Sequence, residues 1–304
     1  MKLQDILNGQ TATVFGVSIS RLLPPPLGYP LARKLADYVA SRRDSSIVKA
    51  VRLNQWMAHK REISGEQLDH SVREVFRSAG RSMYEYWHYL HNRRAILSLV
   101  EFDESMEAAV ERAKNAPNGT LMVTPHISNF DLAGRALGLR GLKMQYLTYP
   151  KPPSGYRWQN ELRILKNVLV TPMSIEALRK ASETLRAGYT VLTGVDRPLP
   201  NTESAKYRPS FMGRPAAMPV FYIRLALKHN LPITVVGGCR KSDGRYHVWA
   251  TEPIAMERGG DLVEETVRNT EMVLRVVTDI IRKTPEQWAM FYPVWPELLS
   301  EVPA

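Results

Sequence analysis

The sequence predicts an α/β fold in which helices cover a central, largely parallel β-sheet, preceded by a helical N-terminal region. From about residue 99 onward, short apolar runs typical of buried strands alternate with amphipathic segments at helical spacing. Before that point, residues 46–98 show only the helical period, with an apolar stripe along residues 71–90. We therefore divide the chain into residues 1–98 and 99–304, and we expect the two regions to form one structural unit.

Residues 12–43 combine apolar and basic side chains in a pattern that suits a lipid interface. An apolar run over residues 14–20 is followed by prolines 24–26, which break any helix. Residues 31–39 then place apolar side chains at helical spacing beside four basic residues, Arg33, Lys34, Arg42 and Arg43. An ordinary surface helix packed on a core has the same pattern, and both interpretations stay open because they concern different faces.

The second region gives a distinct series of elements. Helices are predicted at residues 104–113, 131–139, 175–187, 218–229 and 262–282, and strands at residues 119–123, 144–149, 190–195, 233–237 and 246–250. The last two strands are close enough to pair through a turn at Ser242-Asp243-Gly244. The proline-rich stretches at residues 150–155 and 198–209 are predicted loops.

The charge of the chain narrows the class of partner. The sequence has 41 Lys and Arg against 30 Asp and Glu, a formal net charge of +11, which favours an anionic partner. Because no Walker loop, zinc finger or RNA-binding sheet motif is visible, we expect no nucleic acid. An anionic membrane surface and an acidic carrier protein are the expected partners. The single cysteine, Cys239, excludes an internal disulfide, and no Cys/His spacing predicts a metal site.

Two further features concern the membrane. The first eight residues lack the charged-then-apolar design of a signal peptide. No window approaches the ~20 apolar residues that a spanning helix needs. We therefore expect a peripheral protein on the cytoplasmic face of the inner or plasma membrane.

The most informative motif is His126 followed five residues later by Asp131, at the turn between the strand 119–123 and the helix 131–139. An imidazole can take a proton at neutral pH, and a carboxylate can hold its tautomer, so the pair suits general-base chemistry. Turns after strands are also where α/β folds place their sites. A structural interpretation is equally open, in which Asp131 caps the helix and His126 is a turn histidine.

This spacing resembles the His-x4-Asp signature of the lysophospholipid acyltransferase superfamily. Later segments resemble its branch of bacterial lipid A late acyltransferases and phosphatidylinositol mannoside acyltransferases. They follow the family's order over roughly residues 115–297. These segments are the strand 191–197, the Phe-x-Gly-x-x-Ala loop 211–216, the strand and hairpin 231–246, and the run Pro285-Glu286-Gln287-Trp288.

The resemblance implies a glycerol-3-phosphate acyltransferase-like fold and a membrane-associated O-acyltransferase. A fatty acyl group would pass from a thioester, acyl-coenzyme A or acyl-carrier protein, to a hydroxyl of a glycolipid or lysophospholipid. His126 would be the general base and Asp131 would orient it, without a covalent acyl-enzyme. No bound cofactor or metal is expected.

Further residues are candidates for holding the substrate. Asp196 and Arg197 end a predicted strand near the motif and would orient the acceptor, although a buried ion pair has the same sequence pattern. Guanidinium groups bind phosphate and sugar well, so the candidate ligands also include Arg163, Arg214 and Arg240. Phe130 and Phe211 are candidates for lining the acyl tract, with core packing as the alternative.

Two departures from the branch bear on the acceptor. Residues 220–222 stand where a glycine usually follows the loop proline, and residues 290–295 replace a basic C-terminal run typical of the lipid A enzymes. Both favour a glycolipid or phospholipid acceptor other than lipid A. Two other function classes stay open: a lipid or thioester hydrolase that uses the same His–Asp pair on water, and a non-catalytic membrane-binding protein. No Gly-x-Ser-x-Gly nucleophile elbow supports a serine hydrolase.

Overall fold

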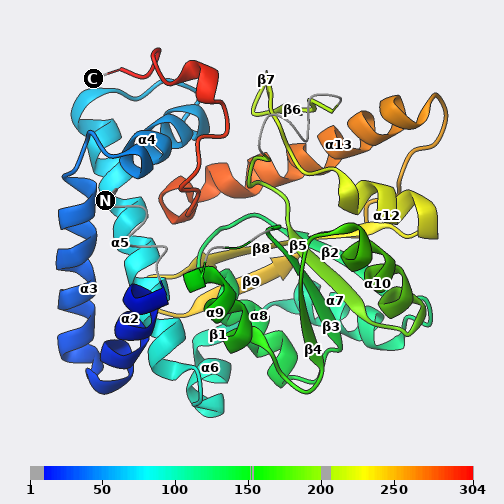
Figure 1. The fold of residues 1–304 in the computed structure, drawn as a ribbon, viewed down its shortest axis with the longest axis horizontal. Helices are drawn as coiled ribbons and strands as arrows, with labels where there is room; N and C mark the ends of the chain where they lie inside the picture. Colours follow the sequence, from blue (N-terminus) through cyan, green and yellow to red (C-terminus); the bar gives the residue numbers. More distant parts are fainter. Residues whose placement is uncertain (1–9, 151, 153, 200–206, 304) are drawn as a thin grey trace.

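The computed structural model describes residues 10–150, 152, 154–199 and 207–303 (Figure 1). Among these residues, seven strands form one sheet in the order β1-β9-β8-β2-β5-β3-β4. The strands are β1 (Val100–Phe102), β2 (Thr120–Thr124), β3 (Met144–Thr148), β4 (Val168–Pro172), β5 (Thr190–Gly194), β8 (Ile233–Arg240) and β9 (Tyr246–Ala250). In this sheet β8 and β9 are antiparallel, and the other pairs are parallel. The predicted α/β class with a largely parallel sheet is confirmed.

Helices cover both faces of the sheet, and each strand contributes alternate side chains to the two sides. Leu121 and Val123 of β2 join one hydrophobic core, which also contains buried residues of α10 (Ile175–Arg186), α12 (Phe221–His229) and α13 (Leu262–Lys283). Met122 joins a second core with α7 (Glu104–Asn115) and α8 (Phe130–Leu139). This two-sided burial explains why the strands are almost continuously apolar in sequence.

The N-terminal region is helical, as the sequence predicts. It contains α2 (Gln10–Leu22), α3 (Pro25–Ala40), α4 (Ser46–Ala58), α5 (Gly65–Tyr89) and α6 (Arg93–Leu99). The long helix α5 contributes Val72 and Val75 to the first core and Tyr86 and Trp87 to the second. Helix α3 packs on α5 and lies at the outer edge of the molecule (Figure 1). Among the residues that the structure describes, none of the helices has the length and apolar character to cross a bilayer.

Helix α9 (Ser154–Arg163), strand β4 and the short strand β1 are among the elements that were not predicted from sequence. Helix α9 buries only Gly155, Asn160 and Arg163 among its described residues, so it carries no apolar stripe to reveal it. Strand β4 lies at the edge of the sheet and is half-exposed. Residues 1–9, on which the signal-peptide prediction falls, lie outside the described residues, as do parts of the predicted loops at residues 151, 153 and 200–206.

Candidate active site

The turn that carries His126 links the end of β2 at Thr124 to the start of α8 at Phe130. Ser128 adopts a left-handed backbone conformation (φ 56°), which bends the chain sharply after His126. Asn129 caps α8, since its side chain accepts a hydrogen bond from the Leu132 amide at 3.2 Å. The C-terminal segment fixes the turn from the other side, because the Ala289 amide donates to the His126 carbonyl at 2.8 Å.

His126 is held by a carboxylate from the neighbouring strand. Its Nδ1 lies 2.6 Å from Oδ1 of Asp196, and its backbone amide donates to Oδ2 of Asp196 at 2.8 Å. Trp288 donates its indole N–H to the same Oδ2 at 2.7 Å, and Asp196 is fully buried. With Nδ1–H donated to Asp196, Nε2 is the ring nitrogen free to accept a proton.

The register of the sheet explains this pairing. Strands β2 and β5 are parallel neighbours, and Thr124 pairs with Gly194 at their carboxyl ends. His126 and Asp196 each lie two residues beyond these partners, so both residues lie side by side at the carboxyl edge of the sheet. Gly194 also leaves room for the imidazole, because a Cβ there would lie 2.7 Å from Cε1 of His126.

Asp131 does not hydrogen-bond to His126. Its carboxylate accepts from Arg163 Nε at 2.7 Å and from Gln159 at 2.9 Å, both on α9. Burial alone would lower the pKa of Arg163, but the adjacent carboxylate of Asp131 more than offsets this and holds that pKa well above its ordinary value. Sequence spacing assigned Asp131 as the orienting carboxylate, whereas the geometry puts Asp196 in that position and Asp131 in an ion pair joining α8 to α9.

A cavity of about 870 Å³ opens beside His126. Its walls come from the β2–α8 turn, from one face of α8, and from the sheet, and much of the lining is apolar, including Ala133, Leu137, Leu192, Val236 and Val248. Phe130 also lines it, with its ring edge-on to the imidazole at 5.1 Å between centroids and an interplanar angle of 79°. The arrangement offers a proton acceptor at the edge of a space suited to an apolar chain. In the described ranges no group of His, Cys, Asp or Glu is placed to bind a metal ion.

Comparison with known proteins places this chain in a family. The family sequence model of the bacterial lipid A biosynthesis acyltransferases matches residues 6–297 of the chain. The chain belongs to this family. It is therefore an acyltransferase of lipid biosynthesis, and the predicted branch of the superfamily is confirmed. A search of curated proteins gave no match.

The remaining predicted ligands of this acyltransferase are divided between the cavity and other places. Arg197 lines the cavity, where its guanidinium lies 3.6 Å from the ring centroid of Tyr149 and 4.0 Å from that of Tyr292. Arg163 also lines the cavity but is committed to Asp131. Neither Arg214 nor Arg240 is among the described residues that line it.

Three of the predicted residues lie outside the cavity. Arg214 is exposed on β7 (Arg214–Pro215), which pairs with β6 (Ser210–Phe211). The Arg240 amide donates to the side chain of Gln287 at 2.7 Å. Phe211 is buried against Trp295, with 5.5 Å between ring centroids, and so packs in the core instead of lining the acyl tract.

Sequence reasoning did not identify the indole of Trp288 as a donor to Asp196. Periodicity carries no signal for such a contact, because Trp288 and Asp196 are 92 residues apart in sequence. The resemblance of the Pro285-Glu286-Gln287-Trp288 run to the family indicated that this segment matters, but not that its indole bonds to Asp196. In the structure, Pro285–Gln287 forms a short 3-10 helix that presents Trp288 to the site.

Proposed function

We propose that this acyltransferase moves a fatty acyl group from a thioester to a hydroxyl of a glycolipid or lysophospholipid, with His126 as general base. The observation that carries the proposal is the His126–Asp196 hydrogen bond of 2.6 Å at the edge of the 870 Å³ cavity. A base oriented by a buried carboxylate beside an apolar space suits proton abstraction from an alcohol next to a bound acyl chain.

The reaction follows from the free ring nitrogen. Nε2 of His126 takes the proton of the acceptor hydroxyl as its oxygen attacks the thioester carbonyl. Asp196 stabilises the imidazolium that forms, as the aspartate of a catalytic triad does. When the tetrahedral intermediate collapses, the C–S bond breaks and the imidazolium returns its proton to the thiolate. The products are an ester and a free thiol, and no covalent acyl-enzyme is needed.

The other predicted groups take supporting roles in this proposal. Asp131 and Arg163 form a buried ion pair that fixes α9 against α8, and thereby one wall of the cavity. Arg197 lines the cavity and is the arginine we assign to the acceptor's phosphate or sugar. Phe130 lines the cavity with its ring edge-on to the imidazole, where it would contact the acyl chain.

We also propose that the enzyme works on the cytoplasmic face of a membrane, with acyl-coenzyme A or acyl-carrier protein as donor. Helices α2 and α3 expose large apolar side chains: Phe15 is 66% exposed, Leu22 82%, Leu27 59% and Leu35 57%. Basic residues interspersed with these side chains would favour an anionic leaflet. The net charge of +11 suits an acidic carrier protein equally well.

The decisive experiment measures thiol release from palmitoyl-coenzyme A and from an acyl-carrier thioester, in liposomes that contain a panel of lipid acceptors. Wild type is compared with His126→Ala and with His70→Ala, which removes an exposed histidine of α5. Acceptor-dependent release that disappears only in His126→Ala supports the proposal, with product ester identified by mass spectrometry. Equal release without acceptor would instead indicate a thioester hydrolase, and release that survives His126→Ala would exclude His126 as the base.

A further inference from the structure

A second cavity, of about 450 Å³, lies in the N-terminal helical region between α3, α4 and α5. It shares no lining residue with the cavity beside His126. Its charged lining consists of four arginines and two aspartates: Arg43, Arg52, Arg73, Arg77, Asp37 and Asp69. The lining therefore carries an excess of positive charge that no role in acyl transfer explains.

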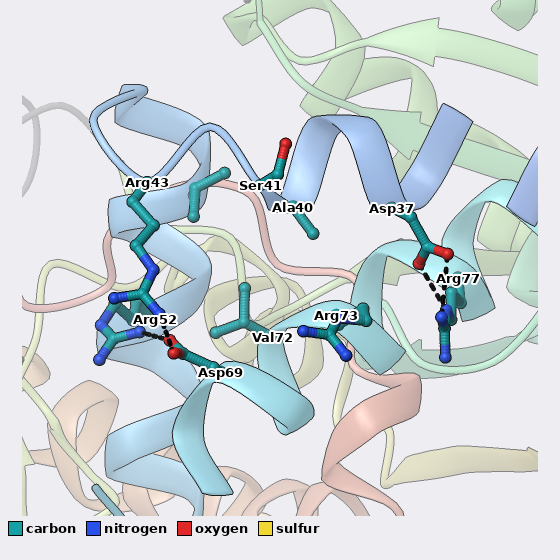
Figure 2. Close-up of a pocket in the computed structure, with 10 residues that line it drawn as sticks. Asp37, Ala40, Ser41, Arg43, Arg52, Asp69, Val72, Arg73 and Arg77 are labelled. Carbon is teal, nitrogen blue, oxygen red and sulfur yellow. Dashed lines mark hydrogen bonds and ion pairs between the residues drawn. The ribbon is translucent and has the colours of Figure 1, made fainter. Parts of the chain in front are cut away.

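Three of the four arginines of this pocket are paired with its two carboxylates (Figure 2). At one end, Arg43 and Arg52 both donate to Asp69. At the other end, Arg77 donates to the two oxygens of Asp37 at 2.6 and 2.9 Å, and also to Glu74 behind it. The Arg77 guanidinium lowers the pKa of Asp37, with Arg33 and Arg73 adding to the effect. Ion pairs thus orient the arginines at both ends of the pocket.

Arg73 is different from the other three arginines. Figure 2 shows it projecting between the two ion-paired clusters. Within the described part of the chain it makes no hydrogen bond or ion pair, and it acts on Asp37 only through space. Arg43 adds a second accessible guanidinium, because its side chain is 64% exposed. An open pocket with one uncommitted guanidinium is suited to bind a phosphate oxygen pair, which a guanidinium contacts with two parallel N–H groups.

The position of the pocket indicates where such a phosphate comes from. Leu27, Leu31, Leu35 and Tyr38 form an exposed apolar stripe on α3. Tyr38 lies three residues before Ser41, which lines the pocket, so the C-terminal end of the stripe reaches the pocket. Ala40, Val48 and Val72 add apolar contact inside the pocket. A lipid whose tails meet the stripe would bring its headgroup to the arginines, whereas a soluble phosphate would use none of the apolar surface.

We propose that this pocket binds the phosphate group of an anionic membrane phospholipid, separately from the acyl-transfer site. Arg73 and Arg43 contact the phosphate, while Arg52 and Arg77 are positioned by their aspartates as the pocket's walls. The site would fix how the enzyme sits on the bilayer. Phosphate binding in this pocket does not depend on His126, so the proposed function and the pocket are tested by different experiments.

The test measures binding of the full chain to phosphatidylcholine vesicles that contain one-fifth phosphatidate, or oleate at matched surface charge. Arg73→Gln is compared with Arg275→Gln, which removes an exposed arginine of α13 far from the pocket in sequence. We expect wild type to prefer phosphatidate over oleate. Losing a charge-assisted pair should weaken phosphatidate binding by roughly 10-fold in Arg73→Gln, with little change in Arg275→Gln.

Three outcomes would overturn the proposal: equal losses in both variants, equal binding to oleate and phosphatidate, or glycerol 3-phosphate in solution binding as tightly as the vesicles. The first two would indicate general electrostatic attraction, and the third a soluble ligand. Arg73→Lys keeps the charge but not the planar pair of donors, so it should restore binding only in part. Thermal unfolding of each variant checks that the fold is retained.

Discussion

His126 and Asp196 are joined by a 2.6 Å hydrogen bond although 70 residues separate them in sequence. The carboxylate is completely buried and also accepts from the His126 amide and the Trp288 indole. Three donors converge on one aspartate, so the imidazole is held in a single orientation. This relationship, and not the five-residue spacing from His126 to Asp131, defines the candidate catalytic pair.

Asp196→Asn should lower kcat by about 10²–10⁴-fold, because the amide cannot stabilise the imidazolium and favours the wrong tautomer. The amide oxygen can still accept from Trp288, so the fold should persist. Initial rates with a thioester donor and a lipid acceptor, alongside circular dichroism, give the measurement. Wild-type turnover in a folded Asp196→Asn protein would remove Asp196 from the mechanism.

Asp131→Asn should act mainly on stability. It leaves the guanidinium of Arg163 buried without its ionic partner, which costs about 3–5 kcal/mol in typical proteins. Glu107→Gln is the matched control, since its partner Arg140 and Glu107 itself are both substantially exposed and such pairs contribute about 0–1 kcal/mol. Urea unfolding measures the difference. A small change for Asp131→Asn, combined with a large loss of kcat, would restore Asp131 to a direct catalytic role.

Gly194→Ala should displace the imidazole, because the new Cβ would lie 2.7 Å from Cε1 of His126. We expect a fall in kcat of about 10²-fold, the scale of a misplaced reacting group, with KM for the donor nearly unchanged. Gly238→Ala is the control: Gly238 also lines the cavity, but its nearest contact would be an ordinary 3.6 Å. Similar kinetics for the two variants would mean that the imidazole is not held tightly by Gly194.

Leu137→Trp should shift the enzyme toward shorter acyl chains. Leu137 lines the cavity two turns along α8 from Phe130, about 10 Å from the His126 end at 1.5 Å per residue. A larger side chain there would fill the far part of the tract and leave the base untouched. Relative kcat/KM for thioesters of increasing chain length provides the measurement, and an unchanged preference would place the acyl chain elsewhere.

Cys239 should react slowly with maleimides. Burial raises the pKa of its thiol, and Lys241 lowers it by less, so the thiolate fraction at pH 8 is below that of a free cysteine. The labelling rate should therefore still rise with pH beyond the ordinary thiol pKa of ~8.5. Stopped-flow labelling measures this rate, with the urea-unfolded chain as the reference. A rate that reaches a plateau below pH 8 in the native protein would contradict the shift.

The sequence alone predicted much of the fold, because burial on two faces leaves a strong local signal. The strands at Leu121–Val123, Val191 and Val235 are apolar runs, and α13 shows a clear amphipathic period. Helix α9 was not predicted because its buried residues make polar contacts, and strand β4 was not predicted because it lies half-exposed at the edge of the sheet. Asn160 and Arg163, for example, are buried through hydrogen bonds and not through apolar packing.

The candidate site could be predicted only in part, because contacts between distant segments leave no local signal in the sequence. A motif on one turn identifies His126, since it depends on residues close together in the chain, and the order of several short segments identifies the family. Which carboxylate reaches the imidazole is decided by the pairing of Thr124 with Gly194 in parallel strands, and by α8 starting at Phe130 and aiming Asp131 at α9. Local sequence therefore determined the proposed base, the helical N-terminal region and the α/β class. The tertiary structure decided the partner of the base, the extent of the cavity and the arginine pocket, because each depends on contacts between segments distant in sequence.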